Sequence, residues 1–146
     1  MMYKAFVKAV SCYYPNRTVT NEQLVSEFPE WTVEKIANKV GVHSRHIVDE
    51  NETAVDLAIK AGECLFTEYS LIKREDIDFI LLCTQSPDFF LPSSSCIVQA
   101  KLGLLTNCGA FDFNLGCSGY IYGLAVAKGL ICGGIEIGRA SCRERV

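Results

Sequence analysis

Apolar and polar residues alternate at the start of the chain. Between residues 3 and 10, small apolar side chains take every second position and lysines lie among the others, which is the period of a strand. The Tyr-Pro-Asn sequence at 14–16 is a turn signal that ends this run. The pattern therefore predicts a first strand over residues 3–10.

Two short helices are predicted next, and each begins with a capping residue. Thr20 followed by Gln23 matches a capping box, so a helix is expected to begin there and to stop before Pro29. Thr32 is the expected cap of a second helix over 33–40, and the glycine that follows ends it.

The longest predicted helix begins where Thr53 is followed by Asp56. Apolar and small residues fall on one of its faces at helical spacing: Val55, Ala58, Ile59, Gly62, Leu65 and Phe66. A continuous apolar run over 78–84 then predicts a central strand that is covered on both faces.

The second half of the chain is predicted to form a helix, a strand and a further helix. Pro92 and three serines open a helix that runs to Leu102, and 110–114 is a short strand. A turn rich in glycine at 115–119 leads into a helix of small residues over 120–129. Strands that alternate with helices predict an α/β layered fold with a largely parallel sheet.

Composition narrows the class of protein. The chain has 146 residues, of which 49% are apolar and 21% charged, enough for one buried core and too apolar for a disordered tail. A net charge of -3 argues against nucleic-acid binding. No apolar run is long enough to cross a bilayer, and the first ten residues lack the core of a signal peptide, so we expect a cytoplasmic protein with no membrane contact.

Cysteine is the unusual component, with eight copies. Without a signal peptide, disulfide bonds are not expected. No two cysteines form a CxxC pair and neither His43 nor His46 lies near a cysteine pair, so no metal site is predicted and both histidines are interpreted as exposed or hydrogen-bonded structural residues. Most of the thiols lie in apolar runs, which favours small buried core residues.

Cys117 is the exception, because it lies between glycines where a predicted strand turns into a helix. Unpaired backbone N–H groups and the helix dipole at such a position stabilise a thiolate. The N–H groups of Cys117 and Ser118 can also hold an oxyanion that forms when the sulfur attacks a thioester. A nucleophilic cysteine and a packed cysteine at a tight turn are both open on this geometry.

Four segments in order identify a family. Residues 110–124 (AFDFNLGCSGYIYGL) resemble the nucleophile motif of β-ketoacyl-(acyl carrier protein) synthase III, in the thiolase superfamily. Residues 41–47 (GVHSRHI) and 51–54 (NETA) resemble its early GIRERHI and NET signatures, and 91–99 (LPSSSCIVQ) resembles its FPSAACQIQ segment. The resemblance implies a thiolase-like layered fold, of which this chain would be the N-terminal half.

The resemblance also implies a reaction. Cys117 would take an acyl group from acyl-CoA as an enzyme-bound thioester, and the family then condenses it with malonyl-(acyl carrier protein) in fatty acid biosynthesis. Acyl-CoA is a substrate, so no cofactor is implied. A histidine and an asparagine that assist decarboxylation lie in the family's second half, so the fragment itself is expected to be inactive.

Substrate-binding residues follow from the resemblance as well. The family stacks the CoA adenine on a tryptophan near the early motif, and Trp31 is the single tryptophan here, although it lies ten residues before Gly41. Core or surface packing is its alternative role. Lys39 matches an arginine near the CoA entrance and can meet a phosphate as a point charge.

The resemblance also implies a segment that contacts a second copy of the chain. In the family, a bulky residue before the Pro-Ser dipeptide reaches across a homodimer and closes the partner's acyl pocket. Leu91 matches this residue, with Phe89 and Phe90 just upstream. The resemblance implies that all three contact the second copy and that Leu91 also contacts substrate, while an ordinary hydrophobic loop anchor is the alternative.

The end of the chain has a different character. Residues 137–146 break the apolar pattern and resemble the translation of a widely used sequencing adapter. We therefore expect residues 1–136 to be the truncated N-terminal part of a thiolase-like condensing-enzyme domain and 137–146 to be a non-native tail. A solvated basic terminus is the alternative.

Other functions remain open. The cysteine turn is common to polyketide-type and other acyltransferases of the thiolase superfamily. A non-catalytic thiolase-fold subunit that pairs with an active partner is a second alternative, although such subunits usually lose the nucleophile. A redox or metal protein rests on the cysteine count alone.

Overall fold

The computed structural model describes residues 4–134. The chain divides into two compact units. Unit 2 is Tyr14–Thr53, and unit 1 is formed by the residues before it together with those from Ala54 onward. The predicted tail over 137–146, and the first residue of the strand predicted over 3–10, lie outside the described residues.

Unit 2 contains two strands and two helices: β1 (Arg17–Thr20), α1 (Asn21–Glu27), α2 (Val33–Val40) and β2 (Ser44–Ile47). The strands pair antiparallel, with Thr18 opposite His46. Both helices were predicted, whereas the strand pair was not. The two strands are four residues long and largely polar, so neither shows a run of alternating apolar residues.

The predicted helix caps of unit 2 are confirmed. The N–H of Gln23 donates to Thr20 Oγ1 at 3.3 Å, and Gln23 Oε1 accepts from the N–H of Thr20 at 2.9 Å. Thr32 Oγ1 accepts from the N–H of Lys35 at 3.1 Å. Gly41 ends α2 with a φ of 69°, in the left-handed region that glycine adopts without strain.

Asn21 links two parts of this unit by hydrogen bonds, and no sequence pattern predicted this role. Its side chain is 1% exposed. Its Nδ2 donates to Val42 O at 2.9 Å, and its Oδ1 accepts from Arg45 Nη2 at 2.6 Å. Both contacts join the start of α1 to the chain that enters and forms β2.

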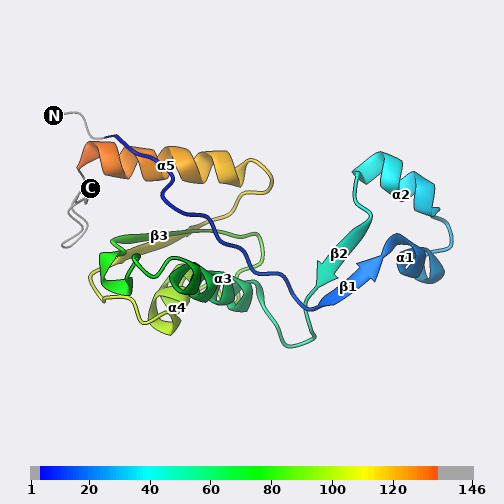
Figure 1. Cartoon of the computed structure of the whole chain (residues 1–146), viewed down its shortest axis with the longest axis horizontal. Coiled ribbons are helices and arrows are strands. Elements are labelled where there is room, and N and C mark those ends of the chain that lie inside the picture. The colour runs from blue at the N-terminus through cyan, green and yellow to red at the C-terminus, as the bar shows by residue number, and fades with distance from the viewer. Residues whose placement is uncertain (1–3, 135–146) are drawn as a thin grey trace. The chain divides into compact units, whose positions relative to one another are not determined.

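The described residues of unit 1 form one short 3-10 helix and five longer elements: α3 (Ala54–Glu68), η1 (Arg74–Asp76), β3 (Phe79–Cys83), α4 (Ser94–Lys101), β4 (Gly109–Phe113) and α5 (Gly119–Gly133). β3 and β4 pair in parallel, with Cys83 opposite Phe113. Helices α3 and α4 lie on one side of this sheet and α5 on the other (Figure 1). The predicted α/β layering is confirmed.

The core of unit 1 lies where α3 and α4 pack on the sheet. Its buried side chains are Val55, Val98, Leu102, Leu104 and Cys108. Ala58, Ile59 and Phe66, from the predicted stripe on α3, pack against it. Gly62 of the same stripe lets the helices approach, because a Cβ there would lie 2.8 Å from Leu102 Cδ1.

Arg74 joins three parts of this unit. Its Nε donates to Leu102 O at 2.8 Å, its Nη2 donates to Glu63 Oε2 at 2.6 Å, and its guanidinium carbon lies 4.7 Å from the centre of the Phe66 ring. The two charged side chains are 41% and 47% exposed, so solvent screens the ion pair and the bond to the carbonyl contributes more.

Arg74→Met is therefore expected to lower the free energy of unfolding by about 1 to 2 kcal/mol, since methionine keeps part of the apolar contact and removes every donor. Urea unfolding followed by circular dichroism measures the change. Lys73→Met, which alters a neighbouring exposed lysine, is the matched control and should shift the free energy by less than about 0.5 kcal/mol. Equal losses in the two variants would contradict this account of Arg74.

The strand predicted over 3–10 is wrong for the residues that the structure describes, because 4–10 form no strand. Phe6, Val7 and Val10 are exposed. The segment is held at its end by side chains of α3 and of the residue after it: Tyr69 Oη donates to Val10 O at 3.2 Å, and Lys60 Nζ donates to Tyr13 Oη at 3.4 Å. A strand needs a neighbouring strand for its backbone, which the alternating pattern alone does not supply.

The outer face of α5 is apolar and exposed. Its exposed residues include Tyr120, Ile121, Tyr122, Leu124 and Val126. The inner face is made by small residues, since a Cβ on Gly123 would lie 3.1 Å from Phe113 Cζ. Within residues 4–134, no helix combines the length and the apolar content that a membrane crossing requires.

Candidate active site

Cys117 lies in the turn that joins β4 to α5, and its side chain is exposed. The N–H of Gly119 donates to Gly116 O at 2.8 Å and closes the turn. In the described part of the chain, the N–H groups of Cys117 and Ser118 have no hydrogen-bond partner. An accessible thiol and two unpaired N–H groups therefore belong to one turn, which is the arrangement that a thioester-forming cysteine needs.

The end of β3 supports this turn. Cys83 Sγ donates to Leu115 O at 3.3 Å. The same sulfur occupies the space beside Gly119, where a Cβ would lie 2.3 Å from it. At the other glycine, a Cβ on Gly116 would lie 3.5 Å from Gln85 Oε1, an ordinary contact distance.

Asp112 in β4 binds the beginning of α4. Its Oδ2 accepts from the N–H of Ser94 at 2.6 Å and its Oδ1 accepts from the N–H of Ser95 at 2.7 Å. Both serines are 0% exposed. The carboxylate thus satisfies two of the unpaired N–H groups at a helix N-terminus, where negative charge is favoured.

Phe89, Phe90 and Leu91 form an exposed apolar loop that leads into α4. Phe90 is 101% exposed and Leu91 is 86% exposed. The peptide bond from Leu91 to Pro92 is cis. The loop leads into α4, and Asp112 of β4 binds the start of that helix. The Cys117 turn follows directly after β4, so the loop and the turn are both linked to this strand.

The two substrate-binding candidates of unit 2 lie at opposite ends of α2. Trp31 is half-buried and precedes the helix, and Lys35 Nζ lies 4.7 Å from the centre of its ring. Lys39 is exposed in the last turn. An eight-residue helix is about 12 Å long, so the structure does not bring the two side chains into one cluster.

The histidines of unit 2 have separate environments. His46 Nδ1 lies 2.7 Å from Pro15 O, and the Tyr14 ring packs against the His46 ring at 5.1 Å. His43 is exposed. Across residues 4–134, no group of three histidine, cysteine, aspartate or glutamate side chains is arranged to hold a metal ion.

The prediction that most thiols are buried is wrong for several of them. Among the described cysteines, Cys108 is buried, Cys64 and Cys132 are half-buried, and Cys12, Cys83, Cys96 and Cys117 are exposed. Cys83 ends a strand and Cys96 lies in the first turn of a helix, where apolar runs leave the core. Burial, with a smaller contribution from the charge of Asp78, raises the pKa of the Cys108 thiol, which disfavours it as a nucleophile.

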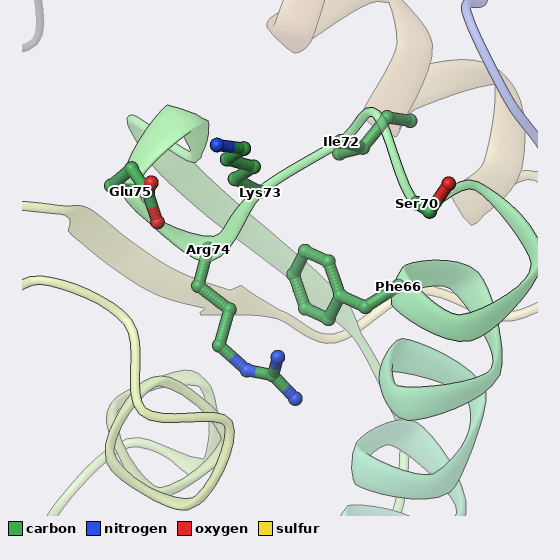
Figure 2. Close-up of a pocket in the computed structure, with 6 residues that line it drawn as sticks. All are labelled: Phe66, Ser70, Ile72, Lys73, Arg74 and Glu75. Carbon is green, nitrogen blue, oxygen red and sulfur yellow. The ribbon is translucent and has the colours of Figure 1, made fainter.

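A surface hollow of about 310 Å³ lies elsewhere in unit 1, between the end of α3 and η1 (Figure 2). It is lined by Phe66, Ser70, Ile72, Lys73, Arg74 and Glu75. None of the predicted site residues lines it. The Arg74 guanidinium is already bound by Glu63 and by Leu102 O.

Sequence reasoning missed two residues near the turn. Asp112 had a usable signal, because it is a charged residue inside an apolar strand sequence and such a residue needs a partner. Cys83 had none, since its role depends on the register that sets it opposite Phe113.

Comparison with known proteins gives a consistent result. No model of a protein family matches the chain. The chain is 38% identical over 136 residues to "Beta-ketoacyl-[acyl-carrier-protein] synthase III 2" of Halalkalibacterium halodurans, a match that covers 91% of this chain and 39% of the relative. It is 40% identical over 139 residues to the β-ketoacyl-[acyl-carrier-protein] synthase III of Campylobacter jejuni subsp. doylei, covering 92% and 41%.

Solved structures agree with these relatives. A crystal structure of a 3-oxoacyl-(acyl-carrier-protein) synthase III matches with a TM-score of 0.80 and 44% identity, over 86% of this chain and 37% of the other. The synthase III of Thermus thermophilus matches with a TM-score of 0.78 and 32% identity, over 89% and 39%. The chain spans about two fifths of the length of the proteins it matches.

Proposed function

From the homology of this chain to the β-ketoacyl-[acyl-carrier-protein] synthase III family, we propose that the protein is an acyltransferase in which Cys117 is the nucleophile. The relatives confirm the predicted family, and the solved structures confirm the thiolase-like fold for the part that this chain covers. One observation carries the role of Cys117: an exposed thiol shares a turn with two N–H groups that have no partner among the described residues.

The first step is transfer of an acyl group from acyl-CoA. The Cys117 thiolate attacks the carbonyl carbon, a carbon–sulfur bond forms, and the carbonyl oxygen takes the negative charge. The N–H groups of Cys117 and Ser118 donate to that oxygen. When the oxyanion collapses, the bond to the CoA sulfur breaks, and CoA leaves as a thiolate that takes up a proton.

The second step is condensation with malonyl-(acyl carrier protein), as in fatty acid biosynthesis. The family resemblance assigns decarboxylation to a histidine and an asparagine from the part of the relatives beyond the length matched here. We therefore expect the 146-residue chain to accept an acyl group at most. The condensed product is expected from a protein that supplies that part.

Binding residues complete the proposal. Trp31 would take the adenine of CoA, and Lys39 would meet a phosphate. Leu91, with Phe89 and Phe90, would contact the second copy in a homodimer and close its acyl pocket, and their high exposure supports a role that needs a partner surface. The protein is proposed to be cytoplasmic and to use acyl carrier protein as its partner.

Sequencing the source DNA past the codon for Glu136 tests the proposal first. The expected result is a reading frame that continues into a second α/β half with the histidine and the asparagine. The product of that frame is then assayed for 3-oxoacyl-(acyl carrier protein) from acyl-CoA and malonyl-(acyl carrier protein). A frame that ends at Val146, or a complete product that makes no condensed acyl chain, would overturn the proposal.

A further inference from the structure

The thiol of Cys83 lies next to the end of β4. Cys83 is the last residue of β3 and stands opposite Phe113, the last residue of β4. The N–H of Thr84 then donates to Phe113 O at 3.3 Å, which continues the pairing by one residue. The chain that follows β4 therefore begins its turn beside the Cys83 side chain.

Cys83 Sγ contacts this turn at two points that lie two residues to either side of Cys117. Before Cys117, the thiol donates to Leu115 O at 3.3 Å. After it, the sulfur fills the space beside Gly119, which is buried. The nucleophile thus lies between two residues that the same sulfur atom touches.

The contact with the Cys83 sulfur, and not a backbone conformation reserved for glycine, explains why residue 119 is a glycine. The described glycines with positive φ are Gly41, Gly103 and Gly134, so Gly119 has a conformation that alanine also adopts. At the first residue of a helix, alanine would normally stabilise the fold relative to glycine. The main obstacle is the sulfur, which would lie 2.3 Å from the added Cβ, whereas Leu115 Cβ would lie at 3.3 Å and Cys83 Cβ at 3.7 Å.

We propose that Cys83 is a positioning residue for Cys117: its thiol holds the carbonyl of Leu115 and the start of α5, and so fixes the turn that carries the nucleophile. The inference rests on the proposed role of Cys117. Hydrogen bonding fixes the orientation of the peptide after Leu115, and packing fixes Gly119. The unpaired N–H groups of Cys117 and Ser118 lie between these two points and have no other partner among residues 4–134.

The reactivity of Cys117 distinguishes a hydrogen-bonding role of the Cys83 thiol from a role in packing alone. If the sulfur only fills a gap, removing it changes stability and leaves the reactivity of Cys117 unaltered. If its hydrogen bond orients the turn, then the reactivity falls when the donor is lost and returns when a different donor takes its place. Cys83→Ala removes the donor, and Cys83→Ser restores one at nearly the same site.

The experiment measures the rate at which iodoacetamide alkylates Cys117 in the full chain between pH 6 and pH 9, with peptide mass spectrometry to separate Cys117 from the other thiols. Cys83→Ala is expected to slow this rate by about three- to tenfold, the effect of one hydrogen bond. Cys83→Ser is expected to return it to within about twofold of the unaltered chain. Cys96→Ala, which removes another exposed thiol, is the matched control and should leave the rate unchanged.

Gly119→Ala and the double variant Cys83→Ala/Gly119→Ala provide the steric test. Gly119→Ala is expected to lower the urea midpoint of unfolding and to slow alkylation, because the new Cβ displaces the sulfur. In the double variant the midpoint should rise above that of Gly119→Ala, since the clash with the sulfur is gone and the tight contact with Leu115 Cβ at 3.3 Å remains. Its alkylation rate should stay at the level of Cys83→Ala, because the donor is still missing.

Two results would overturn the inference. One is an alkylation rate in Cys83→Ala that stays within about twofold of the unaltered chain, which is less than the loss of one hydrogen bond predicts. The other is a lowered rate that Cys83→Ser fails to restore, which would show that a hydrogen-bond donor at position 83 does not set the reactivity of Cys117. Alkylation needs no acyl-CoA, so a complete protein that shows these effects but transfers no acyl group would contradict the proposed function and leave the positioning role intact.

Discussion

Replacing Cys117 with alanine is expected to lower the rate of acyl uptake from acyl-CoA by at least about a thousandfold, because the turn with the unpaired N–H groups then has no thiol to form the thioester. The measurement is the mass increase of the intact protein after incubation with acyl-CoA, followed by peptide mapping. Serine at this position is expected to be nearly as inactive, since an alkoxide forms far less readily than a thiolate and the turn provides no base among the contacts described.

Cys96 provides the control for this variant. It is also exposed, and its sulfur lies 3.1 Å from Ser93 Oγ in the first turn of α4. Cys96→Ala should take up the acyl group at an unchanged rate. If Cys117→Ala still became acylated at the wild-type rate while another thiol carried the acyl group, the assignment of the nucleophile would be wrong.

Asp112→Ala is expected to lower the free energy of unfolding by about 2 to 5 kcal/mol, because it leaves the buried N–H groups of Ser94 and Ser95 without acceptors. The loss of a negative charge at the start of α4 adds to this effect. Asp112→Asn keeps one acceptor oxygen but presents an NH2 group to the second N–H, so about half of the loss is expected. Urea unfolding measures both values.

Glu68→Ala is a suitable comparison for Asp112. Glu68 is an exposed carboxylate at the end of α3, and its replacement should change the free energy of unfolding by less than about 0.5 kcal/mol. A loss of similar size at the two positions, or no loss at Asp112, would show that the contacts to Ser94 and Ser95 do not stabilise the fold.

Local signals predicted the helices well. The caps at Thr20 and Thr32, and the glycine at 41, each depend on side chains or dihedral angles within four residues, which the sequence displays directly. The apolar stripe of α3 is likewise local, and its residues pack in the core as expected.

Strands depended on partners that the sequence does not show. The apolar run at β3 was long enough to predict a buried strand, and β4 was found within one residue of its expected start. In contrast, the alternating residues 4–10 form no strand, while β1 and β2 pair despite weak patterns. Strand formation at these places is decided by tertiary context.

The candidate site divides in the same way. Cys117 could be identified from its own neighbours, because the glycines and the transition from strand to helix are adjacent in sequence. Cys83 and Asp112 act across the sheet or between β4 and α4, at separations of 32 and 18 residues for the bonds to Leu115 and Ser94. Such contacts depend on strand register and on helix packing, so they could not be predicted from the local sequence pattern.

The N-terminal segment has a consequence for synthesis on the ribosome. Val10 accepts its hydrogen bond from Tyr69, which is made 59 residues later, and unit 2 lies between them in the chain. At about 5 to 20 residues per second, the segment waits roughly 3 to 12 s for this partner. Unit 2 can close its own contacts during that interval, so the segment that ends at Val10 is expected to dock after unit 2 has folded.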